Sequence, residues 1–68
     1  MKLVDFLSKL ALKTAQVTCI DNDTEEEVVQ LRADGYESLA TSVSDREVVR
    51  WTITGATAVS VTLGNVVE

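Results

Sequence analysis

The stretch that decides the fold is Val48–Leu63, VVRWTITGATAVSVTL. Apolar and polar residues alternate in both halves of this stretch, and a small break containing a glycine separates the halves. Period-two alternation of β-branched and aromatic residues around such a break is typical of a β-hairpin. We therefore expect two antiparallel strands whose odd-numbered side chains share the buried face: Val49, Trp51, Ile53, Val59, Val61 and Leu63.

The alternation also predicts how the two strands pair. Opposed residues of an antiparallel pair share a face, so odd-numbered residues must face odd-numbered partners. A two-residue loop at Ala56-Thr57 is not expected, because it would place Trp51 opposite the polar Thr62. A loop of three or five residues satisfies the rule with three pairs: Ile53 with Val59, Trp51 with Val61, and Val49 with Leu63.

The first half of the chain predicts a helix and a second hairpin. Residues 2–12 carry apolar side chains at helical spacing, which indicates an amphipathic helix. Thr14–Ile20 and Glu27–Ala33 alternate like strands and are separated by the polar segment Asp21–Glu26. The expected pairs are Cys19 with Val29, Val17 with Leu31, and, on the other face, Ile20 with Val28.

Two segments complete the chain. Tyr36–Val43 fits a two-turn helix or a bent continuation of the preceding strand, and Asn65–Glu68 is expected to be a tail. The predicted fold is a single α+β domain over residues 1–68, in the order α-β-β-(α)-β-β. Its amino-terminal helix should pack on a small, mainly antiparallel four-stranded sheet.

The size and charge of the chain bound its function. A domain of 68 residues buries about 60% of its unfolded surface, and this thin core favours self-association, so we expect a homodimer. The net charge of −5 disfavours nucleic-acid binding. Neither a membrane span nor a secretory signal is evident, and with a single unpaired cysteine a cytoplasmic location is expected.

The residues that carry chemistry are few. With one cysteine and no histidine, neither an intrachain disulfide nor a zinc site is expected, and Cys19 is best explained as a small buried hydrophobe. The acidic loop, Asp21–Glu27, begins like the calcium-binding loop of an EF-hand, with oxygen ligands at alternate positions. An EF-hand loop needs glycine at its sixth position and glutamate at its twelfth, and these positions are Glu26 and Arg32 in this chain. We expect no catalytic residue, no cofactor and no metal, and hence no enzyme.

The outer face of the sheet is the candidate interaction surface. Its even-numbered residues are rich in threonine and include two arginines in an otherwise acidic chain. An ordinary solvated face is the alternative. The candidate residues are Gln16, Gln30, Arg32, Arg50, Thr52 and Thr62. Trp51 is interpreted as a core side chain beneath Phe6 and Leu10, with an interface anchor as the alternative.

The layout resembles small uncharacterised proteins encoded by bacterial phages and prophages. The resemblance rests on the Leu/Lys-rich segment Met1–Leu10, the strand and acidic turn Val17–Asp23, and Asp45–Val49, DREVV. The segment Tyr36–Val43 departs from the pattern of that group. The resemblance implies a phage-associated accessory protein without assigned activity, and it supplies no functional residues.

Three functions are therefore considered. The first is a small, homo-oligomeric protein-interaction module. The second is an acidic inhibitor that mimics nucleic acid and occupies a host enzyme, suggested by the net charge and the run Asp21–Glu27. The third, less favoured, is a sheet that binds single-stranded nucleic acid through Arg32, Arg50 and Trp51.

Overall fold

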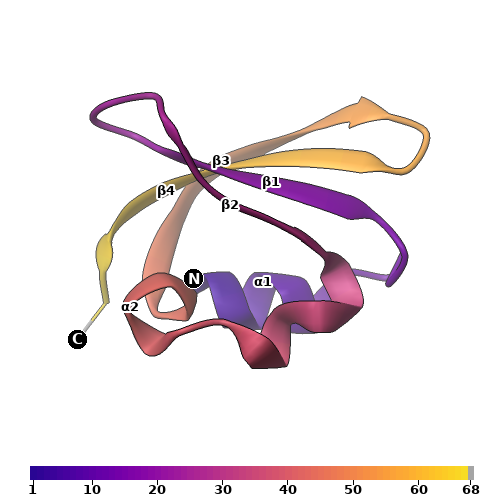
Figure 1. The fold of residues 1–68 in the computed structure, drawn as a ribbon, viewed down its shortest axis with the longest axis horizontal. Coiled ribbons are helices and arrows are strands. Elements are labelled where there is room, and N and C mark those ends of the chain that lie inside the picture. Colours follow the sequence, from indigo (N-terminus) through magenta and orange to yellow (C-terminus); the bar gives the residue numbers. More distant parts are fainter. Residues whose placement is uncertain (68) are drawn as a thin grey trace.

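A layer of helices lies beneath one face of a four-stranded sheet in the computed structural model, which describes residues 1–67 (Figure 1). This arrangement confirms the α+β class. In chain order the elements are α1 (Leu3–Lys9), β1 (Gln16–Asp21), β2 (Glu27–Arg32), the 3-10 helix η1 (Ala33–Ser38), α2 (Thr41–Ser44), β3 (Arg46–Gly55) and β4 (Ala58–Val66).

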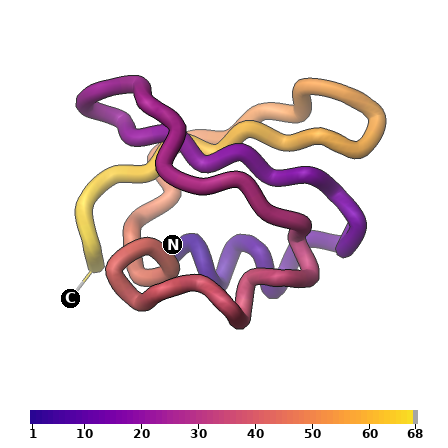
Figure 2. The backbone as a smooth tube through the Cα atoms, in the orientation of Figure 1, coloured from indigo at the N-terminus to yellow at the C-terminus, as the bar shows by residue number. Residues whose placement is uncertain are grey.

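The sheet is mixed, and the prediction of a mainly antiparallel sheet was wrong. The strand order is β2-β1-β4-β3, with β1 and β4 parallel in the centre and one antiparallel partner at each edge. The segment with η1 and α2 runs along the helical layer, next to α1, from one edge strand to the other (Figure 2). This crossover brings the second hairpin beside the first with β4, its more deeply buried strand, toward the centre.

Most of the predicted pairs are present. Cys19 lies opposite Val29 and Val17 opposite Leu31 in the first hairpin. Two of the pairs predicted for the second hairpin are also present: Trp51 with Val61, and Ile53 with Val59.

The departures from the predicted register all occur at irregularities of the ladder. Val48, not Val49, lies opposite Leu63, because an extra residue bulges between Val48 and Arg50. Ile20 likewise lies opposite Glu27 instead of Val28. Successive side chains of a strand point to opposite faces of the sheet. Each inserted residue therefore moves the side chains on one side of it to the face opposite the predicted one.

The turn of the second hairpin also differs from the prediction. Gly55 lies opposite Ala58, so Ala56-Thr57 forms a two-residue turn, and the prediction of a three- or five-residue loop was wrong. The ladder shifts between Ile53 and Gly55, where Thr54 is the extra residue. This bulge lets a tight turn coexist with the pairing of Trp51 and Val61.

Helix α1 is shorter than predicted and is followed by an extended backbone at Leu10. The Lys13 ammonium group donates hydrogen bonds to the carbonyl oxygens of Leu7 and Ser8, at 3.1 and 2.8 Å. A cation near the last carbonyl groups is favourable at the carboxyl end of a helix. The apolar stripe of α1 is buried as expected through Leu3, Phe6 and Leu7.

The core lies between α1 and the two central strands. Its buried apolar members are Leu3, Phe6, Leu7, Ala15, Val17, Cys19, Ala33, Val59, Val61 and Leu63. The expectation that all odd-numbered strand residues are buried was wrong for β3. Val49, Trp51 and Ile53 have exposed fractions of 44%, 52% and 68%.

The remaining two segments also differ from the expectations. Between Tyr36 and Val43 the chain is neither one helix nor an extended strand: η1 ends at Ser38 and α2 begins at Thr41. The expected tail is partly strand, since β4 continues to Val66, which lies opposite Arg46. Glu68, the last residue of that expected tail, lies outside the described residues.

Candidate functional site

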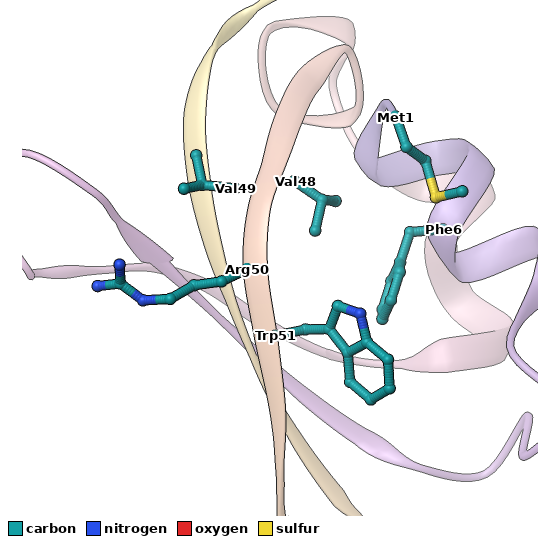
Figure 3. A pocket seen from close by; sticks show the side chains of 6 residues that line it. All are labelled: Met1, Phe6, Val48, Val49, Arg50 and Trp51. Atoms are coloured by element: carbon teal, nitrogen blue, oxygen red, sulfur yellow. The ribbon is translucent and has the colours of Figure 1, made fainter.

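The six residues predicted to form an interaction face come together on the side of the sheet away from α1. Gln16 lies opposite Arg32, and Thr62 lies opposite Arg50. A row of four polar residues crosses the whole sheet between these pairs: Gln30, Thr18, Ser60 and Thr52. Figure 3 shows the Arg50 side chain directed away from α1. The sequence therefore located this face, and its role in binding stays a prediction.

The two arginines of this outer face differ in their surroundings. The Arg32 guanidinium forms an ion pair with Asp34, with an N–O distance of 2.9 Å, and both side chains are exposed. Exposed pairs of this kind contribute little to stability. Within residues 1–67, no carboxylate forms an ion pair with Arg50. Arg50 is thus an exposed cation in a chain with a net charge of −5.

A second surface surrounds Trp51, on the same side of the sheet as α1. Three open depressions meet there, with volumes of about 390, 300 and 170 Å³. We call this surface the Trp51 groove, because the indole lines all three depressions. Its main apolar side chains are Met1, Phe6, Leu10, Leu12, Trp51 and Ile53.

Trp51 and Phe6 form an aromatic pair in the groove. The ring centroids of Phe6 and Trp51 are 5.6 Å apart, and the ring planes are inclined by 53°. This separation lies in the range of about 4.5–7 Å that aromatic pairs prefer. Figure 3 shows Met1, Phe6, Val48 and Trp51 on the α1 side of β3, whereas Val49 and Arg50 point away. One side of the indole thus contacts Phe6, and about half of the side chain remains exposed.

Few charged residues line the groove. Lys9 and Arg50 are the charged residues among those that line the three depressions, and the Arg50 guanidinium points to the outer face (Figure 3). The acidic loop between β1 and β2 lies at the opposite end of the sheet from the turn between β3 and β4 (Figure 1). The groove is therefore an apolar surface with Lys9 at its border.

Sequence reasoning placed Trp51 and Ile53 on the correct face of β3 but missed their exposure. The feature that could have revealed this exposure is the length of the helix relative to the length of the strand. A helix of seven residues extends about 10 Å, whereas a strand of ten residues extends about 33 Å. Because α1 covers the centre of the sheet, it leaves the outer part of β3 uncovered.

Cys19 has the surroundings expected of a small hydrophobe. Its side chain is fully buried among the core residues. Burial raises the pKa of the Cys19 thiol to about 11, while the charge of Arg46 acts in the opposite direction. The thiol is therefore protonated near neutral pH, which is unsuitable for a nucleophile.

The first residue of the acidic loop has a structural role. The Asp21 carboxylate accepts hydrogen bonds from Arg46 and from the backbone N–H and hydroxyl of Thr24. These bonds, with that of Arg46 foremost, lower the pKa of Asp21 below its ordinary value. Arg46 also donates to the carbonyl oxygens of Gly64 and Leu63, so it joins β1, β3 and β4. Over residues 1–67, no three acidic or cysteine side chains are grouped so that they could hold a metal ion.

Comparison of the chain with protein-family models, with curated proteins and with solved structures finds no match. None of the helices in the described part of the chain has the length and apolar character needed to cross a membrane.

Proposed function

We propose that this chain is a small, non-enzymatic protein-interaction module and that the Trp51 groove is its binding surface. The observation that carries this proposal is the half-exposed Trp51 indole where three depressions meet. Tryptophan is enriched at the energetic centres of interfaces. A contiguous apolar surface with a polar or charged border is also typical of a protein-binding site.

The proposal has two further parts. The chain is non-enzymatic, which the burial and high pKa of Cys19 support. It acts in the cytoplasm in association with a phage or prophage, and this part rests on the sequence layout alone. The partner is a protein, either another copy of this chain or a different one.

Photo-cross-linking from one position of β3 and one position of β2 tests the binding surface. A photoreactive phenylalanine derivative at position 51 lies in the groove, whereas the same residue at position 30 lies on the outer face, on the other edge strand. We expect a protein adduct from position 51 in native cells and none from position 30. Adducts from position 30 alone would move the binding surface to the outer face, and no adduct from either would contradict the proposal.

The acidic, nucleic-acid-mimicking inhibitor is the alternative function. It is less well supported, because the carboxylates of residues 21–27 are concentrated at one hairpin and Asp21 is already paired with Arg46. Replacing Glu25, Glu26 and Glu27 with lysine should therefore leave the position-51 adduct unchanged. Loss of the adduct in this triple variant would favour the alternative.

A further inference from the structure

Strand β3 forms one edge of the sheet, and part of that edge is free. β3 has β4 on one side. On its other side, the first residues of the chain cover the beginning of the strand: Lys2 forms a bridge with Glu47, and the Val48 N–H donates to the Met1 carbonyl at 2.8 Å. Beyond Val48, no further strand of the described chain follows β3 in the sheet. The residues from 49 to 55 therefore leave edge N–H and C=O groups open to another strand.

This free edge is complementary to itself. When two copies of β3 pair antiparallel about a two-fold axis at Thr52, residue numbers in each pair add to 104. Trp51 then faces Ile53 of the other copy, and Arg50 faces Thr54. Each pair keeps apolar with apolar and polar with polar, which is the condition for a symmetric interface. Aromatic side chains opposite β-branched ones are among the favourable cross-strand pairs.

The charge distribution permits this pairing. Between residues 49 and 55 the single charged residue is Arg50. The two Arg50 side chains would be four residues apart along the strands, about 14 Å, which exceeds the Debye length of about 8 Å at physiological salt. The acidic loop of each copy joins β1 and β2, at the end of the sheet opposite the turn between β3 and β4, and two strands separate β2 from β3 (Figure 1). Pairing through β3 thus brings the least acidic part of two acidic chains together.

We infer that the partner is a second copy of this chain, joined through β3 with Thr52 on the two-fold axis. This inference rests on the proposed function and names the occupant of its surface. The exposed Trp51 and Ile53 side chains become covered by their counterparts between the two α1 helices. Because Arg50 would face the bulged Thr54, regular pairing about Thr52 is confined to Trp51, Thr52 and Ile53, so we expect a reversible dimer. A two-fold contact is closed and does not propagate into a fibre.

Sedimentation of the full chain tests the dimer. Between about 1 µM and 1 mM we expect a monomer–dimer equilibrium, with the dissociation constant raised at least about tenfold by Ile53→Lys. Val28→Lys is the matched control, because Val28 is an exposed β-branched residue on the opposite edge strand and the charge change is identical. We expect Val28→Lys to dimerise like the natural chain. A dimer equally sensitive to both variants, or insensitive to Ile53→Lys, would overturn the inference.

Disulfide trapping tests the register. Residues on a two-fold axis face each other, at a separation that a disulfide can bridge. Under mild oxidation, Thr52→Cys should therefore form a covalent dimer at least about tenfold faster than Gln30→Cys, which lies in the same polar row on the other edge strand. Equal rates would overturn the inference.

The two tests separate this inference from the proposed function. If the chain stays monomeric at all concentrations while position 51 cross-links to a protein of different mass, the binding surface stands and the self-pairing falls. If neither self-association nor any adduct is found, both fall.

Discussion

Comparing two alanine variants tests how far the core extends. Ile53 and Leu63 both lie on the α1 side of the sheet, yet Leu63 is fully buried and Ile53 is 68% exposed. Full burial of such a side chain stabilises by about 1.5–3 kcal/mol, so the remaining third at Ile53 corresponds to about 0.5–1 kcal/mol. Leu63→Ala also leaves a cavity and should cost about 2–5 kcal/mol. The free energy of unfolding should therefore fall much more in Leu63→Ala than in Ile53→Ala.

The measurement is urea unfolding followed by far-ultraviolet circular dichroism, at a protein concentration where sedimentation shows a monomer. Low concentration matters because association would bury Ile53 and add to its cost. A chain of this size has about 3–10 kcal/mol of stability, so Leu63→Ala is itself at risk of unfolding. Leu63→Val, expected to cost about 1 kcal/mol, is the milder second variant. Equal losses for Ile53→Ala and Leu63→Ala in the monomer would refute the reasoning.

Three further predictions concern single sites. Because the folded-state pKa of Asp21 is lowered, its contribution to stability is complete above its unfolded pKa of about 4 and is lost as pH falls through the folded value. Thermal melts of Asp21→Asn should therefore lose part of the acid dependence between about pH 2 and 5, and an unchanged dependence would contradict the role of Arg46. Cys19, with a pKa of about 11, should react with a thiol reagent at pH 8 at least about 100-fold more slowly in the folded chain than in urea; similar rates would show that the thiol is accessible. A Cβ at Gly64 would lie 3.0 Å from Val49 Cγ2, so Gly64→Ala should destabilise by about 1 kcal/mol, and adding Val49→Ala should restore the melting temperature unless the crowding lies elsewhere.

The outer face and the groove show where sequence reasoning succeeded and where it stopped. The six polar candidates share a face because alternation assigns each strand residue to one side of the sheet, whichever strands are neighbours. The groove depends on the position of β3 at an edge and on the extent of α1. Neither property is encoded in the alternation within β3.

The β-bulges of β3 are a second feature that the sequence pattern did not predict. Pairing of Trp51 with Val61 follows from the pattern on each strand, and it is present. The pattern assumed an unbroken ladder, however, and therefore assigned Val49 instead of Val48 to the buried face. In the folded chain, Val49 and Thr54 are extra residues in the ladder between β3 and β4. They shift the face to which side chains point before and after the regular run of residues 50–53.

By itself the sequence determined the first helix, the two hairpins, their central pairs and the apolar stripe of α1, because each follows from a local period of side chains. Tertiary structure decided which strands of the two hairpins became neighbours, and so made β1 and β4 a parallel pair. It also decided that Trp51 is half-exposed. The physical reason is that a period assigns a side chain to a face, whereas burial requires another element long enough, and close enough, to cover it.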